Sequence, residues 1–134
     1  MRYYRHWRHA QLRVKTGIDL NPYCAEEGIH IVHGKIVVNS CAKIGKHCKI
    51  LSDVTIGALS RYDIGGAPIL GDRVFVSSGV RIIGNIRIAD GVVIGANAVV
   101  IKDIVEPNTT WVGIPARKVS DSGSAFYLRK QFRE

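Results

Sequence analysis

The sequence predicts an all-β fold, a rod of short parallel strands wound as a β-helix from six-residue repeats. An aliphatic residue returns at every sixth position between residues 32 and 56 and again between residues 70 and 100. The residue two positions earlier is in most cases small or branched, so both side chains share one face of an extended strand. Many of the 14 glycines fall near the ends of the repeats, where a corner needs positive φ. A fixed short period of this kind is typical of a solenoid.

The aliphatic residues of the repeat are expected to form the core. They are Val32, Val38, Ile44, Ile50 and Ile56 in a first run, and Leu70, Val76, Ile82, Ile88, Ile94 and Val100 in a second. One repeat cannot bury its apolar side chains alone, but stacked coils bury a continuous column of them. Each buried side chain stabilises by roughly 1.5–3 kcal/mol, which suffices for a narrow rod. A sandwich or barrel of short strands is the alternative, although its strands would not keep phase for so long.

Three stretches carry a more specific signature: AKIGKHCKILSDVTIG (42–57), GDRVFVSSGVRIIGNIRIADGVVIGANAVVIKD (71–103) and VGIPARKV (112–119). Over residues 17 to 120 the chain resembles the hexapeptide-repeat acyltransferases, and most closely the serine acetyltransferases and their relatives in polysaccharide gene clusters. The resemblance implies a left-handed parallel β-helix of triangular section, with three repeats to a coil. Handedness does not follow from the pattern itself, because parallel crossovers are right-handed in about 98% of cases.

The chain of 134 residues has the length of one small domain. We expect a basic segment at 1–16, the β-helix acetyltransferase domain at 17–119, and a hinge with a C-terminal tail at 120–134. Its three cysteines form no CxxC motif and follow no secretory signal, which indicates a reducing cytoplasm. No apolar run approaches the ~20 residues of a membrane span.

The formal net charge of +8 favours an anionic partner. No nucleic-acid motif is visible, so we expect no nucleic-acid partner, and a polyphosphate such as coenzyme A accounts for part of the excess. Residues 1–16 carry five Arg or Lys and no acid. This segment fits either a helical cap on the first coil or contact with an anionic membrane surface. The tail fits a short packed helix or a frayed end.

His33 is the candidate catalytic residue. A histidine suits proton abstraction from a hydroxyl at neutral pH, provided that a second group, usually a carboxylate, orients its ring. His33 directly precedes the strand-like run GKIVVN (34–39), at a corner of the rod. The resemblance implies that His33 is the general base and that Asp19, in the run DLNP, is its carboxylate partner. The spacing between the two is one residue shorter here than in the family.

The other histidines are interpreted as structural. His30 is expected at an inward-facing position of the wall, and His47 at an exposed turn. A zinc site on this fold, as in the γ-class carbonic anhydrases, would need three converging histidines. His30, His33 and His47 do not have that family's spacing, so we expect no metal.

A loop is expected to leave the rod between residues 57 and 69. The interval from Ile56 to Leu70 is longer than a pair of repeats by two positions, and loops on rigid scaffolds often carry recognition. In the family a histidine of this loop helps to hold the carboxylate of the amino acid; here the nearest cation is Arg61. The acidic residue before the catalytic histidine is replaced by Val32. These differences favour a sugar hydroxyl of capsule or exopolysaccharide as acceptor, with L-serine as the alternative.

The cofactor residues follow from the resemblance alone. It implies a homotrimer in which the pantetheine arm of acetyl-CoA lies in a groove between subunits, along small residues on adjacent coils. Ser78 and Ala96, which are three repeats apart, fit that role. Lys102, Arg117 and Lys118 are the candidate ligands for the phosphates, which they suit by charge-assisted hydrogen bonds.

The resulting hypothesis is an acetyl-CoA-dependent O-acetyltransferase in which the acceptor hydroxyl attacks the thioester directly. Two other classes of function stay open. One is a non-catalytic β-helix scaffold. The other is a basic surface-binding module that uses residues 1–16 and the tail.

Overall fold

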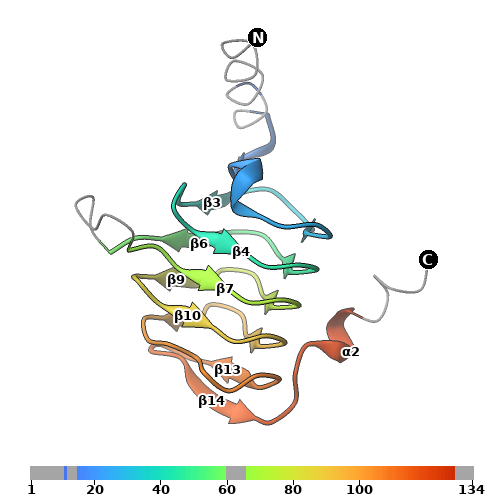
Figure 1. Cartoon of the computed structure of the whole chain (residues 1–134), viewed down its shortest axis with the longest axis vertical. Helices are drawn as coiled ribbons and strands as arrows, with labels where there is room; N and C mark the ends of the chain where they lie inside the picture. The colour runs from blue at the N-terminus through green and yellow to red at the C-terminus, as the bar shows by residue number, and fades with distance from the viewer. Residues whose placement is uncertain (1–10, 12–14, 60–65, 129–134) are drawn as a thin grey trace.

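Short strands form three sheets, which are the three sides of a rod (Figure 1). All the strand pairs are parallel except the last, in which β14 runs antiparallel to β13. The computed structural model describes residues 11, 15–59 and 66–128. Sheet 1 contains, in order, β1 (Ile18–Asp19), β3 (Ile36–Val38), β6 (Val54–Gly57), β9 (Arg81–Ile83) and β12 (Val99–Val100). Sheet 2 contains β4 (Lys43–Ile44), β7 (Ile69–Leu70) and β10 (Arg87–Ile88). Sheet 3 contains β2 (His30–Ile31), β5 (Lys49–Ile50), β8 (Phe75–Val76), β11 (Val93–Ile94), β13 (Thr110–Val112) and β14 (Arg117–Ser120).

The chain visits sheets 1, 2 and 3 in turn, so each coil contains three repeats. Ile36 pairs with Val54, and Arg81 pairs with Val99, in each case three repeats further along the chain. This register confirms the predicted β-helix with three repeats to a coil. A single turn of 3₁₀-helix, η1 (Pro22–Cys24), replaces a strand in the first coil, where Asn21 accepts a hydrogen bond from the Tyr23 N–H.

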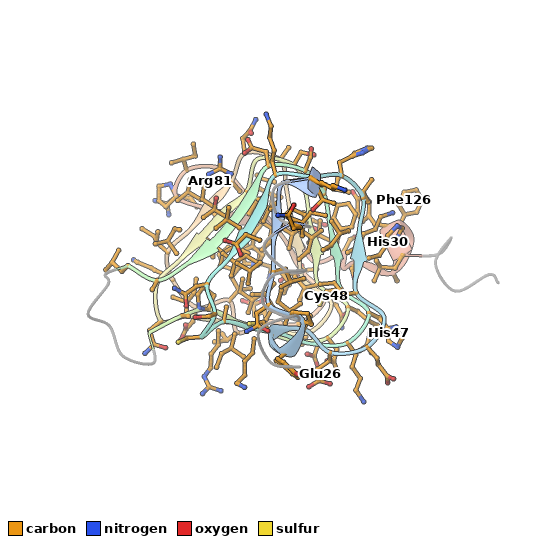
Figure 2. The ribbon with its side chains drawn as sticks, turned by 90° about the horizontal axis from the view of Figure 1, so that it is seen from above. Glu26, His30, His47, Cys48, Arg81 and Phe126 are labelled. Carbon is orange, nitrogen blue, oxygen red and sulfur yellow. The ribbon has the colours of Figure 1, made fainter. Side chains whose placement is uncertain are left out.

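The predicted aliphatic column is the core. Of its eleven members, all except Val32 are buried side chains, and several have no exposed surface at all. The small or branched residues two positions earlier share the interior, including Ala42, Cys48, Val74, Val80 and Ala98. Seen down the rod, Arg81 and Phe126 lie on different sides of the section and Cys48 lies inside it (Figure 2).

The prediction is wrong by one residue in the coil that carries His33. Ile31, and not Val32, pairs with Ile50 and packs against the core. His30 therefore pairs with Lys49 and is exposed on sheet 3, where an inward-facing wall residue was expected.

The cause is a longer corner. Four residues, 32–35, connect β2 to β3, whereas three residues, 51–53, connect β5 to β6 one coil below. The extra residue shifts the six-residue repeat of the preceding strand by one position relative to the strands that follow the corner. Since successive side chains of a strand point to opposite faces, a shift of one exchanges inside and outside.

Two edges of the rod turn at residues in the left-handed conformation. At the edge between sheets 3 and 1, hereafter the 3–1 edge, these are Gly17, Lys35, Asp53, Gly79 and Asn97. At the 2–3 edge they are Gly28, His47, Arg73, Gly91 and Asn108. Glycine is required where the next coil crowds the corner: a Cβ at Gly79 would lie 2.0 Å from Oδ1 of Asn97. Seven of these ten residues are Gly, Asp or Asn, the residue types that corners favour. His47 was expected at an exposed turn, but its side chain is half-buried beneath Gly28.

The predicted loop is longer than the sequence indicates. Lys43 pairs with Ile69, and Ile69 pairs with Arg87 in the next coil. The interval from Lys43 to Ile69 is longer than the regular coil from Ile69 to Arg87 by more than one repeat. The sequence suggested two repeats between Ile56 and Leu70, but one of them is part of the loop and not of the rod. Arg61 lies outside the described residues, as do positions 60–65 in general.

The end of the described chain packs on sheet 3. Residues 120–124 of the predicted hinge are held against the rod, because the Thr110 hydroxyl donates to the Ser122 carbonyl and the Ser124 hydroxyl donates to the Arg73 carbonyl. The short helix α2 (Ala125–Leu128) follows beside the stack (Figure 1), and Leu128 is buried against Phe75 and Val93. Over residues 125–128 the tail is a short helix packed on its own rod, while residues 129–134 lie outside the described residues.

Most of the basic N-terminal segment, residues 1–10 and 12–14, lies outside the described residues. In the described ranges no helix combines the length and the apolar composition that crossing a bilayer requires.

The three thiols are expected to differ sharply in reactivity. Cys24 and Cys48 are buried and Cys41 is exposed. Burial raises the pKa of the Cys24 thiol, and it raises the pKa of Cys48 to about 11. Because the thiolate is the nucleophile, iodoacetamide at pH 8 should label one thiol of the folded protein and all three after unfolding, as mass spectrometry would show. Rapid native labelling at two or more thiols would contradict the structure.

Candidate functional site

His33 lies at the tip of the enlarged corner between β2 and β3, on the 3–1 edge. Its side chain is exposed, and within the described part of the chain it makes no hydrogen bond or ion pair. Gly34 follows it, and a Cβ there would lie 2.3 Å from the carbonyl oxygen of Thr16 in the coil above. The neighbour of His33 must therefore be glycine, and the corner presents the imidazole to solvent together with the side chain of Lys35.

Small residues continue this edge below His33. Backbone hydrogen bonds connect the corners: Asp53 N donates to the Gly34 carbonyl (3.5 Å), Gly79 N to that of Ser52 (3.0 Å), and Asn97 N to that of Ser78 (2.9 Å). His33, Ser52, Ser78 and Ala96 thus occupy one edge in four successive coils. The structure brings together the predicted base and both predicted arm-binding residues.

Ser52 is a member of this edge that sequence reasoning missed. Its hydroxyl lies 3.3 Å from the hydroxyl of Ser78. The sequence does contain the signal, but the inserted loop makes the interval between the two serines longer than a regular coil. The spacing of the two serines corresponds to one coil only when the residues of the inserted loop are subtracted from the interval between them.

Asp19 pairs across the coils with Val37 and not with His33. It lies in β1 opposite Val37, four residues beyond His33, on the outer face of sheet 1. Asp19 has interactions of its own within the protein. The two predicted members of the catalytic pair are therefore on neighbouring coils, but the structure joins them by no hydrogen bond.

Arg81 flanks the edge on the side of sheet 1, and it too was missed. Its guanidinium donates to the backbone carbonyl of Asp53 and lies 3.2 Å from the Asp53 carboxylate. The side chains of Arg81 and Asp53 are both partly exposed. This pair neutralises the acid of the corner that lies directly below His33.

The predicted phosphate ligands lie in different places. Arg117 is exposed in β14 and pairs with Val112, whose Cγ1 would be 2.5 Å from a Cβ at Gly95. Because Gly95 directly precedes Ala96, Arg117 lies at the lower end of the 3–1 edge. Lys102 follows β12 at the edge between sheets 1 and 2, where its side chain is exposed, so it does not share an edge with Ser78 and Ala96.

Lys118 is already engaged by two acids. Its ammonium lies 2.6 Å from a carboxylate oxygen of Asp121 and 2.6 Å from one of Glu106. Hydrogen bonds to Asp121 and then to Glu106 raise the pKa of the Lys118 ammonium. A phosphate at Lys118 would have to compete with both carboxylates.

Within the described ranges, no three His, Cys, Asp or Glu side chains are grouped as metal ligands would be. Arg61, the predicted contact for the acceptor, belongs to the residues that the structure does not describe.

Comparisons with known proteins agree with this architecture. The family model described as "Bacterial transferase hexapeptide (six repeats)" matches residues 67–102. The chain is 37% identical over 113 residues to a serine acetyltransferase of Synechococcus elongatus, which covers 83% of this chain and 46% of the relative. It is also 36% identical over 110 residues to a serine acetyltransferase of Helicobacter pylori. That match covers 81% of this chain and 64% of the relative.

Solved structures show the same likeness. The soybean serine acetyltransferase complexed with serine superimposes with a TM-score of 0.75 at 36% identity, over 83% of this chain and 46% of that one. The chain thus spans about half the length of the relatives that it matches. The repeats, the register and this likeness identify the chain as a hexapeptide-repeat protein with the left-handed parallel β-helix of the serine acetyltransferase-like acyltransferases.

Proposed function

We propose that this protein is an acetyl-CoA-dependent O-acetyltransferase and that His33 is its general base. One observation carries the proposal: an accessible imidazole stands on the same edge of the rod as the small residues Ser78 and Ala96. The relatives that share this rod are named serine acetyltransferases.

In the proposed reaction His33 removes the proton of the acceptor hydroxyl as its oxygen attacks the thioester carbonyl carbon. The carbonyl then re-forms, the bond to sulfur breaks, and the imidazolium returns the proton to the departing thiolate. A base of this kind is typically worth 10²–10⁴-fold in rate. Asp19 is proposed to orient the imidazole, which requires that a side chain rotate, since no hydrogen bond joins the two groups in the described structure.

Acetyl-CoA is proposed to lie along the 3–1 edge. Small side chains leave room for the pantetheine arm, and the hydroxyls of Ser52 and Ser78 offer hydrogen bonds to its amides. Arg117 stands at the lower end, where the phosphates would lie, and Lys118 would join it by exchanging its carboxylate partners. Lys102 is on another edge, so it would reach the same cofactor only from a neighbouring subunit. That geometry supports the predicted homotrimer.

The proposed acceptor is a sugar hydroxyl, as in capsule or exopolysaccharide modification. Val32 stands directly before His33, where the family has an acid, and this leaves an amino-acid ammonium without its partner. L-Serine is the second candidate, which the names of the relatives favour, one of them solved with serine. The three free cysteines support placement in the cytoplasm, and residues 1–16 are proposed to touch an anionic membrane surface.

Release of coenzyme A tests the proposal. Purified protein with acetyl-CoA should release free thiol only when an acceptor hydroxyl is present, and mass spectrometry should find the acceptor heavier by one acetyl group. A panel of L-serine, free sugars, sugar phosphates and nucleotide sugars covers the candidate acceptors. The scaffold alternative predicts no thiol release with any of them. The surface-binding alternative predicts binding to anionic vesicles that disappears when residues 1–16 and the tail are deleted.

A further inference from the structure

Two lysines lie near His33 at the upper end of the 3–1 edge: Lys15 precedes the first coil, and Lys35 belongs to the same corner as His33. A Cβ at Gly34 would lie 2.3 Å from the carbonyl oxygen of Thr16, so the preceding residue, Lys15, lies at the helical end of the N-terminal segment, above the corner that carries His33. Lys35 lies two residues beyond His33 and beneath Gly17, where a Cβ would be 3.1 Å from Lys35 N and 3.8 Å from Lys35 Cγ. Both lysine side chains are exposed.

No acid of the described residues forms an ion pair with either of these lysines. The acid of the next corner below, Asp53, is bound by Arg81. Glu27 belongs to the 2–3 edge, where it pairs with Lys46. The third acid in this part of the rod is Asp19. It lies on the face of sheet 1 and has interactions of its own within the protein.

Lys35 adopts a conformation that lysine avoids. Its φ is +61°, in the left-handed region. At the same position of the 3–1 edge the other coils have residues that tolerate this region better, namely Gly17, Asp53, Gly79 and Asn97. A lysine here costs conformational energy, and the described chain offers its ammonium no salt bridge in return. Such outliers concentrate where a ligand is held.

We propose that the acceptor is an anionic hydroxyl compound, a phosphorylated sugar, whose phosphate lies between Lys15 and Lys35 while one of its hydroxyls reaches His33. This inference rests on the proposed function and narrows its acceptor. The phosphates of coenzyme A do not account for the two lysines, because Ser78 and Ala96 lie two and three coils below His33 and Arg117 lies beyond them. A free sugar phosphate and a nucleotide sugar present the same chemistry.

Paired acceptors test the inference. Thiol release from acetyl-CoA is followed with glucose, glucose 1-phosphate, UDP-glucose and L-serine. We expect kcat/KM to be roughly ten- to a hundredfold higher for a phosphorylated acceptor than for glucose, the size of one or two hydrogen bonds to a charged group. That advantage should shrink as salt is raised, because ions screen exposed charges. Glucose 1-phosphate and UDP-glucose distinguish the two sources.

The sharpest variant is Lys35→Asn, since asparagine removes the charge and tolerates the left-handed corner. It should abolish most of the advantage of the phosphorylated acceptor, leaving turnover of glucose and the KM for acetyl-CoA unchanged. Arg73→Asn is the matched control: it removes an exposed cation of the same conformation, φ +54°, from the 2–3 edge, and should change nothing.

Each result decides. Equal or better kcat/KM for glucose or L-serine would overturn the anionic acceptor and leave the acetyltransferase standing. A preference for phosphate that survives Lys35→Asn would overturn the assigned lysine site. Absence of thiol release from every acceptor would overturn the acetyltransferase itself, and this inference with it.

Discussion

Replacing His33 by alanine is expected to lower acetyl transfer by roughly 10²–10⁴-fold, the usual contribution of a general base. The side chain is exposed, so its removal leaves no cavity and should not affect the free energy of unfolding. The loss should fall on kcat and not on binding of coenzyme A, because the residues proposed to bind the cofactor, Ser78 and Ala96, lie lower on the edge. Steady-state kinetics and calorimetric titration with coenzyme A measure the two quantities separately.

His30→Ala is the matched control for that experiment. His30 is an exposed histidine of the same coil, but it projects from sheet 3 and not from the corner. It should keep wild-type turnover. Undiminished turnover in His33→Ala would remove His33 from the mechanism, and weaker binding of coenzyme A with unchanged kcat would assign it to the cofactor instead.

Ile82→Ala should destabilise the rod by about 2–5 kcal/mol, the range measured for such truncations in cores. Ile82 is fully buried in the middle coil and pairs with Ile56 above and Val100 below. In a stack where each coil touches only its neighbours, a cavity at the centre weakens two interfaces at once. Since small domains are stable by only about 5–15 kcal/mol, this loss should be plain in urea denaturation.

Val105→Ala is the control, because Val105 is 77% exposed and loses little by truncation. Its midpoint should stay near that of the wild type. A loss below about 1 kcal/mol in Ile82→Ala would mean that the column of aliphatic side chains is not the main source of stability.

The fold was predictable because its determinant is repeated. Ten of the eleven aliphatic positions are buried as expected, and an error at one repeat does not spread while its neighbours keep phase. The one-residue slip at Val32 and the true length of the loop could not be predicted in the same way. Both are local departures from the six-residue period. Only the strand pairing shows at which residue the regular period begins again.

The site was predictable only in part. Spacing by one whole coil placed Ser78 and Ala96 on one edge, and His33 joined them there because it sits at the same kind of corner. The engagement of Lys118 by two acids depends on how β14 folds back against β13, which no repeat specifies. Lys35 escaped notice because lysine is a poor residue for a left-handed corner, and sequence alone gives no reason to look there.

The enlarged corner at residues 32–35 has a wider consequence. A perfectly regular solenoid offers the same chemistry at every level, so an active centre needs a break in the symmetry. The family model matches residues 67–102, the most uniform portion, and stops well short of His33. Regularity therefore defines the scaffold, while the irregular corner carries the residue that we propose as the general base. Excising one residue from that corner would give it the three-residue length of the corner at 51–53.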